Sequence, residues 1–217
     1  MLRDYFSQDI YTVLILACLV LIVSTRQLFG TRFADFLQVI WNDRYIKLYS
    51  RERKKLDFFN ILLFLSYVLS SGVFIHFAYS TLKESLSDDI LLLAYLFSGI
   101  FIITLLKIAV ERVIAHFFEF SEFIKVYIFQ KNAYKNISSF LLLLANILLL
   151  FSDLDKKLVI YSGLTLFFLI NIIGFIRFLR HYQKAIISNF FYFLLYLCAL
   201  EIGPYVILYK VFKDYFG

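Results

Sequence analysis

Six long apolar runs, separated by charged connectors, restrict the fold of this chain more than any other feature. Because a helix rises 1.5 Å per residue, roughly 20 apolar residues cross the hydrocarbon core of a bilayer. The runs cover residues 10–25, 58–82, 90–106, 137–151, 158–176 and 190–212. With only 7 glycines and 1 proline, the chain holds few helix breakers. We therefore predict an all-α fold: a polytopic membrane helical bundle of about six transmembrane helices, in one domain over residues 1–217.

The composition excludes several other classes of protein. Hydrophobic residues make up 62% of the chain, whereas a soluble domain is about 45–50% apolar. A single water-soluble globule could not bury so many apolar side chains, which excludes a soluble enzyme and a disordered tail. The two cysteines, Cys18 and Cys198, both lie inside apolar runs. We expect them to pack as small apolar side chains and not to form a disulfide framework.

The distribution of basic residues predicts the orientation in the membrane. Of the 22 lysines and arginines, 16 lie in the connectors 26–57, 107–136 and 177–189, which share one side in a six-span topology. By the positive-inside rule this side is cytoplasmic, so both termini are expected on the outer side of the membrane. We therefore attribute the net charge of +6 to the topology of a protein whose partner is the lipid bilayer. No sequence motif indicates a nucleic-acid partner.

The first basic connector carries the period of an amphipathic helix over residues 28–49. Its apolar face comprises Phe29, Phe33, Phe36, Leu37 and Ile40. Such a segment can lie in the headgroup plane of the membrane, at the depth that Trp41 and Tyr45 favour. We expect an interfacial helix that supports the fold, with a surface for docking a partner as the alternative.

A second amphipathic pattern covers residues 107–128, and no breaker separates it from the third apolar run. The polar half of the pattern includes Lys107, Glu111, Arg112, His116, Glu119 and Glu122. We expect a helix that prolongs the third span into the cytoplasm. Its charged face is either solvated, with weak ion pairs such as Lys107 with Glu111, or it contacts another protein. Because the face alternates both signs of charge, a protein contact is favoured over anionic lipid.

One acidic residue lies near the middle of the sixth run. Glu201 is about eleven residues from each end of that run, and Gly203 and Pro204 follow it. A charge at this depth is costly, so the carboxyl must face protein or water, and the proline loosens the backbone next to it. The predicted intramembrane polar site is therefore either a proton or cation site or a protonated carboxyl with a structural hydrogen bond. Asn146, at similar depth in the fourth run, is its candidate partner.

We find no sequence motif of a catalytic, cofactor-binding or metal site. His76, His116 and His181 are far apart, and the chain holds no nucleophile elbow, phosphate loop or dinucleotide fingerprint. We therefore expect a protein without enzymatic activity, cofactor or bound metal.

Three segments resemble a known family. They are residues 189–204 (NFFYFLLYLCALEIGP), 32–36 (RFADF) and 42–45 (NDRY). The sequence is similar to uncharacterised integral membrane proteins of Bacteroidota that are catalogued as a domain of unknown function, and the Tyr-Leu-Cys-x-Leu-Glu-Ile-x-Pro core is the specific part. The resemblance implies a protein of the cytoplasmic (inner) membrane, whose outward-facing termini would lie in the periplasm. It implies no activity. Glu201 and Pro204 are part of the shared motif.

These observations lead to three functional hypotheses. The first is a non-enzymatic subunit or scaffold of a larger envelope complex, whose partner is another membrane protein. The alternative is a small proton- or ion-coupled transporter component centred on Glu201. A membrane enzyme that acts on lipid is a third possibility, since the polar face of residues 107–125 could hold headgroups.

Overall fold

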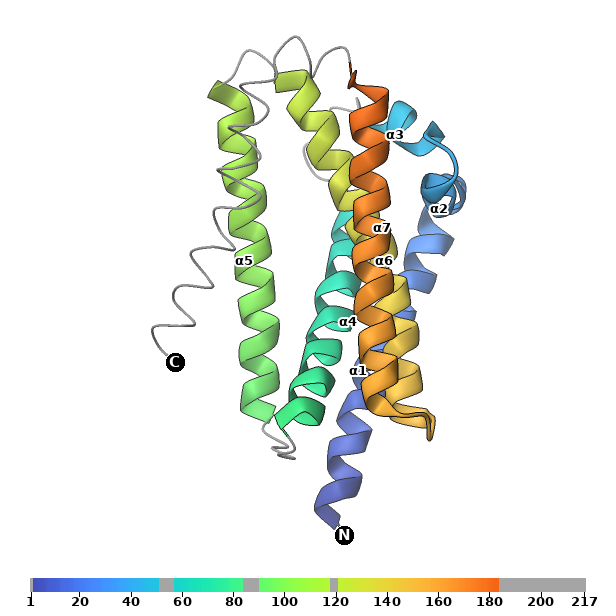
Figure 1. The fold of residues 1–217 in the computed structure, drawn as a ribbon, viewed down its shortest axis with the longest axis vertical. Coiled ribbons are helices and arrows are strands. Elements are labelled where there is room, and N and C mark those ends of the chain that lie inside the picture. Colours follow the sequence, from blue (N-terminus) through green and yellow to red (C-terminus); the bar gives the residue numbers. More distant parts are fainter. Residues whose placement is uncertain (1, 51–56, 84–89, 118–120, 184–217) are drawn as a thin grey trace.

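The structure is a bundle of five long helices that run alternately up and down (Figure 1). It is a computed structural model that describes the backbone of residues 2–50, 57–83, 90–117 and 121–183 and the side chains of residues 9–50, 57–81, 91–111 and 125–183. The long helices are α1 (Leu2–Leu28), α4 (Phe58–Lys83), α5 (Ile90–Phe117), α6 (Ser121–Phe151) and α7 (Lys156–His181). Three short helices lie between α1 and α4: α2 (Gly30–Leu37), η1 (Gln38–Ile40) and α3 (Arg44–Tyr49).

Each of the five long helices contains an apolar stretch long enough to cross a membrane. The prediction of a helical, multi-pass membrane protein is therefore confirmed. The predicted sixth span, residues 190–212, lies outside the described residues. The described helix ends that border the three connectors rich in lysine and arginine lie at the end of the bundle that carries the short helices, at the top of Figure 1. We call this the cap end, and the other the opposite end.

The core of the bundle lies along α4 and α6. In each of these helices 56% of the apolar stretch is buried, against 22% in α1 and α7 and 11% in α5. Small polar residues allow α4 and α6 to pack closely, as in many membrane bundles. Ser70 Oγ donates a hydrogen bond to the Ser139 carbonyl, and the Asn146 amide donates to the Ser70 carbonyl at 2.8 Å. The central pair is thus held by polar contacts in addition to apolar packing.

Glycines bring α7 against the same central helices. A methyl group at Gly174 would lie 2.5 Å from the ring of Tyr134 on α6, and one at Gly163 would lie 3.0 Å from the ring of Phe74 on α4. No larger residue fits at Gly174 without a shift of the ring or of the helix. These contacts fix the height of α7 along the bundle.

Two predicted elements differ from the structure. Residues 107–128 do not form one helix, because α5 ends at Phe117 and α6 begins at Ser121 and runs in the opposite direction. Residues 28–49 are likewise divided among α2, η1 and α3 and are not a single interfacial helix. Their apolar face packs on protein, which requires the chain to bend around α4 and α6.

Candidate functional site

The short helices form a folded cap on one side of α6, and we use "cap" for residues 29–49. Its centre is aromatic: Phe36 and Tyr45 are fully buried together with Phe59 of α4. Rings of Phe129 and Phe140 on α6 complete the cluster, with the ring centres of Tyr45 and Phe129 5.3 Å apart. Aromatic side chains bury large apolar areas. The cap is therefore part of the protein core and does not simply rest on the membrane surface.

An arginine–aspartate pair joins the cap to α4. Arg32 is 6% exposed, and its two terminal nitrogens donate to the two carboxylate oxygens of Asp57 at 2.9 and 2.5 Å. The guanidinium lies over the rings of Tyr49 and Phe59, and Asn60 donates to the same carboxylate. Burial alone would lower the pKa of Arg32, but the hydrogen bond to Asp57 and the interactions with Tyr45 and the Asp57 charge outweigh burial and raise the pKa. Two parallel hydrogen bonds of this kind fix both position and orientation.

A second set of contacts joins the cap to α6 and α7. Arg177 of α7 donates to the backbone carbonyls of Val39 and Trp41, both at 3.3 Å, and it lies 3.6 Å from the carboxylate of Asp43. The Tyr134 hydroxyl donates to the same Val39 carbonyl at 2.9 Å. These bonds satisfy backbone groups that would otherwise need water at the membrane boundary. The segments RFADF and NDRY, which carry part of the family resemblance, thus build the cap.

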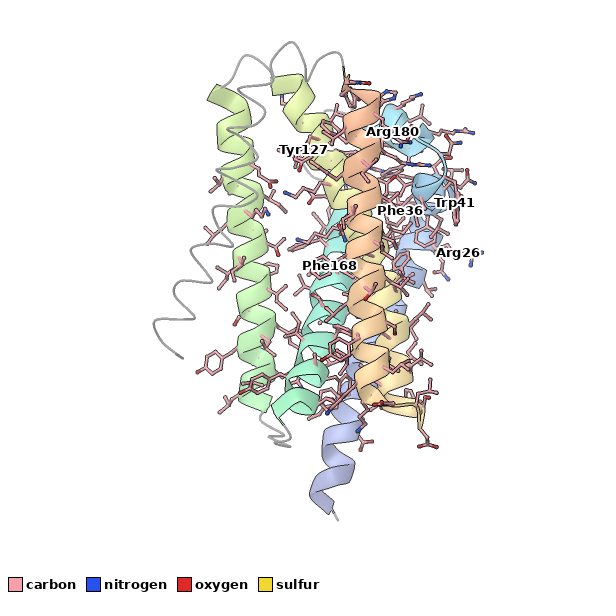
Figure 2. All side chains as sticks on the ribbon, viewed as in Figure 1. Arg26, Phe36, Trp41, Tyr127, Phe168 and Arg180 are labelled. Atoms are coloured by element: carbon pink, nitrogen blue, oxygen red, sulfur yellow. The ribbon has the colours of Figure 1, made fainter. Side chains whose placement is uncertain are left out.

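On the other side of α6 and α7 lies a cavity of about 740 Å³. Its walls come from α5, α6 and α7, with Tyr67 of α4. Figure 2 shows Tyr127 and Phe168 on the side of α6 and α7 that faces α5. The apolar part of the wall includes Ile100, Ile103, Phe167, Phe168 and Ile172, and the polar part includes Lys107, Glu111, Gln130, Lys131 and Lys135. The cavity is therefore apolar toward the bundle centre and cationic toward the cap end.

A buried ion pair forms the polar wall. Glu111 is 1% exposed, and Lys131 Nζ lies 2.5 Å from its carboxylate. Gln130, one residue before, donates to the carbonyl of Gly174 at 3.0 Å, which holds α6 and α7 together at this level. Lys135 Nζ lies 4.4 Å from the ring centre of Tyr67. The described side chains of the wall thus include three ammonium groups and one carboxylate.

The structure changes the interpretation of several predicted site residues. Glu111 does not belong to an exposed partner-contact face, because it is buried against α6, and Lys107 lines the same cavity. The helix keeps its polar side, but that side faces another helix. The other members of this face, Arg112, His116, Glu119 and Glu122, have side chains outside the described part of the chain.

The predicted intramembrane polar site is described only in part. Asn146 is fully buried between α4 and α6, where its amide nitrogen bonds the Ser70 carbonyl and its oxygen has no hydrogen-bond partner among the described residues. Glu201, Gly203 and Pro204 lie outside the described residues. Within the described ranges, no three His, Cys, Asp or Glu side chains are grouped so that they could hold a metal ion.

Sequence reasoning missed the residues that hold the cap, namely Arg32, Asp57, Tyr134 and Arg177. Arg32 and Asp57 are 25 positions apart, so no helical spacing links them. The only signals were two charged residues in unusual positions. An aspartate lies directly before an apolar run, and an arginine lies inside the apolar face of an amphipathic pattern. A charge in either place needs a partner.

Comparison with known proteins leads to a family and not to an activity. Neither a comparison with curated proteins nor one with solved structures found a match. A family model described as a domain of unknown function (DUF4271) matches residues 11–212, which is nearly the whole chain. This chain is therefore a member of the DUF4271 family.

Proposed function

We propose that the protein is a non-enzymatic subunit or scaffold of a larger envelope complex in the cytoplasmic (inner) membrane. The cap lies on the cytoplasmic side, and both termini lie in the periplasm. The orientation is supported by the high lysine and arginine content of the three connectors whose described bordering helix ends lie at the cap end, while the described helices alternate in direction. The partner is another membrane protein.

The observation that carries this proposal is the exposed apolar edge of a rigidly held cap. The exposed large apolar side chains of the cap are Leu37, Trp41 and Leu48, and Leu28 at the end of α1 is exposed as well. Trp41 is 78% exposed, although Arg177 holds its backbone carbonyl. Figure 2 shows it on the side of the cap away from α5. A tryptophan on a fixed backbone loses little conformational freedom on binding, and this residue type is enriched at interface hot spots.

Site-specific photo-crosslinking in living cells tests this proposal. A photoreactive amino acid replaces Trp41 in the full chain, and irradiation should give one discrete protein adduct. The matched control is Tyr95, an aromatic residue of α5 that is 74% exposed near the opposite end, and it should give no such adduct. Adducts with lipid alone at position 41, or the same protein adducts at both positions, would overturn the proposal.

A second candidate function is favoured by the cavity. An ion pair at the end of two spans, Glu111 with Lys131, borders a cavity of about 740 Å³, and ionisable groups in such positions often mark ion or proton pathways. We propose a proton- or ion-coupled transporter component as the alternative. Purified protein in liposomes with an internal pH dye should then show proton uptake that Glu111→Gln abolishes. Uptake equal to that of empty liposomes would exclude it.

A further inference from the structure

We infer that the partner docks on the cap through an acidic amphipathic helix. The apolar side of that helix contacts Trp41, and its carboxylates face Arg26 and Lys47 of this chain. This inference rests on the proposed function, because it names the chemistry of the partner that the same surface would hold. The sign of the exposed charge and the character of the outer face of α2 both point to such a helix.

The exposed charged side chains of residues 26–49 are all basic. They are Arg26, Arg44 and Lys47. The two acidic residues of this range, Asp35 and Asp43, are only partly exposed, and their carboxylates lie 3.5 and 3.6 Å from arginine side chains of this protein. Within the described part of the chain, Arg26 and Lys47 have no ionic partner. The surface therefore presents cations to a partner, and carboxylates complement them.

Arg26 lies in an unusual place for an exposed cation. It belongs to the last turn of α1, inside the apolar stretch Asp9–Leu28. Figure 2 shows it on the same side of the bundle as Trp41, away from α5. Near the end of a membrane span the effective dielectric constant is lower than in bulk water, so a neighbouring carboxylate stabilises a guanidinium more strongly there. An acidic residue beside the apolar side of a partner would therefore gain most at this position.

The outer face of α2 has small side chains at one end and a tryptophan beyond the other. Four exposed residues at helical spacing form this face: Gly30, Ala34, Leu37 and Trp41. A methyl group at Gly30 would have no atom within 4 Å, so the backbone there is open to a close neighbour. Small residues allow helices to approach one another closely in membranes, and Trp41 on its fixed backbone can serve as an anchor. The face thus suits a helix.

The exposed side of α1 gives a comparison within the same chain. It carries large aliphatic side chains in succession: Val13, Leu16, Leu19, Val20 and Val23. The outer face of α2 has the small residues Gly30 and Ala34 in its centre instead. The polar residues Thr31 and Gln38 lie along one edge of it and are exposed. Lipid tails gain little contact area from glycine and alanine and cannot bond a hydroxyl or an amide, whereas a protein helix can use both. A protein partner is therefore favoured over lipid.

Tryptophan fluorescence of the purified full chain tests the charge preference directly. Trp41 is the only tryptophan in the sequence, so the emission reports on this surface alone. The probes are two synthetic amphipathic helices of about five turns that lack tryptophan and share one side of alanine and leucine. One carries glutamate beside that side and the other carries lysine. In nanodiscs of neutral phosphatidylcholine, the glutamate peptide should shift the Trp41 emission to shorter wavelength and bind about tenfold more tightly than the lysine peptide.

Neutral variants identify the cations that give this preference. Arg26→Gln with Lys47→Gln should make the two peptides bind with similar affinity. The matched control is Lys156→Gln with Lys157→Gln, which removes two exposed cations at the opposite end and should leave the preference intact. Equal binding of both peptides to the unmodified chain, binding of neither, or a preference that survives Arg26→Gln with Lys47→Gln would overturn the inference.

Nanodiscs that contain phosphatidylglycerol test lipid as the competing occupant. Without any peptide, replacing part of the phosphatidylcholine by this anionic lipid should leave the Trp41 emission unchanged. A shift as large as the one that the glutamate peptide causes would assign the surface to anionic headgroups and would overturn the inference.

Photo-crosslinking in cells separates this inference from the proposed function. With the photoreactive amino acid at position 41, Arg26→Glu with Lys47→Glu should lower the yield of the protein adduct several-fold, and Lys156→Glu with Lys157→Glu should not. An adduct whose yield survives the reversal of Arg26 and Lys47 would contradict the acidic partner and leave the proposed function standing. If position 41 gives no protein adduct even with all four basic residues in place, the proposed function fails and the inference fails with it.

Discussion

The two sides of α6 at the cap end differ sharply in how they hold charge. On the cap side, Arg32 makes two parallel bonds to Asp57 between two aromatic rings, and the space around it is filled by buried aromatic side chains. On the cavity side, the Lys131 ammonium lies 2.5 Å from the Glu111 carboxylate beside an open volume of about 740 Å³. The partners of the two pairs are 25 and 20 positions apart in the sequence. The first pair is enclosed by packed aromatic rings, whereas the second borders the cavity.

The choice of cation explains much of this difference. The planar guanidinium of arginine fits a carboxylate in one orientation and stacks on aromatic rings, whereas a lysine ammonium is a compact, strongly hydrated charge on a flexible stem. The cap side therefore fixes geometry. The cavity side places charge where a further group can join it.

The largest effect is expected for Arg32→Ala. Removal of one partner of a buried ion pair costs about 3–5 kcal/mol, because the other charge stays without compensation. The free energy of unfolding in detergent, measured by denaturant titration, should fall by an amount in this range. Arg32→Lys should recover only part of the loss, since lysine keeps the charge but cannot make the two parallel hydrogen bonds to Asp57. Arg44→Ala is the control, because its side chain is 66% exposed at 3.5 Å from Asp35, and it should cost no more than about 1 kcal/mol.

The second effect concerns the contact between α6 and α7. In Gly174→Ala the new methyl group would overlap the ring of Tyr134, and overpacking of this kind costs about 1–3 kcal/mol. Gly99→Ala is the matched control, because nothing lies within 4 Å of a methyl group there. Thermal unfolding of both variants should show a loss for position 174 and none for position 99. An equal change at both positions would mean that α7 does not approach α6 as closely as described.

A smaller effect is expected for Glu111→Gln on the cavity side. Lys131 loses its carboxylate partner, but it is 21% exposed and borders open space, so its charge can reach water. We expect the free energy of unfolding to fall by about 1.5 kcal/mol, the lower part of the range for a charged hydrogen bond. A loss as large as that of Arg32→Ala would show that the cavity side is as tightly packed as the cap side.

The smallest effect is expected for Tyr134→Phe. This change removes the hydroxyl that donates to the Val39 carbonyl and leaves the ring in place. Because Arg177 also donates to that carbonyl at 3.3 Å, the acceptor stays satisfied and the loss should be about 1 kcal/mol. The double variant Tyr134→Phe with Arg177→Ala should lose more unfolding free energy than the sum of the losses of the two single variants. A loss equal to that sum would argue against a shared acceptor.

The sequence predicted the five apolar helices that the structure describes, because length and apolar character are local properties. It also indicated that residues 28–49 are helical and amphipathic, but not which surface the apolar face covers. Phe33 and Phe36 give the same pattern against lipid as against protein. The distinction lies in Arg32, whose place in an apolar face requires a partner that the sequence does not specify. Glu111 shows the same limit, since a polar helix face can turn toward solvent, a partner or a neighbouring helix.

The cap is a folded part of the bundle and not a helix on the membrane surface, because its aromatic centre is buried against α4 and α6. Hydrogen–deuterium exchange of the full chain in lipid nanodiscs tests it. The backbone amides of residues 33–49 should exchange as slowly as those of α6, because they pack against it, and Arg32→Ala should release that protection while α6 stays protected. Fast exchange of residues 33–49 in the unmodified chain, unchanged by Arg32→Ala, would contradict the account.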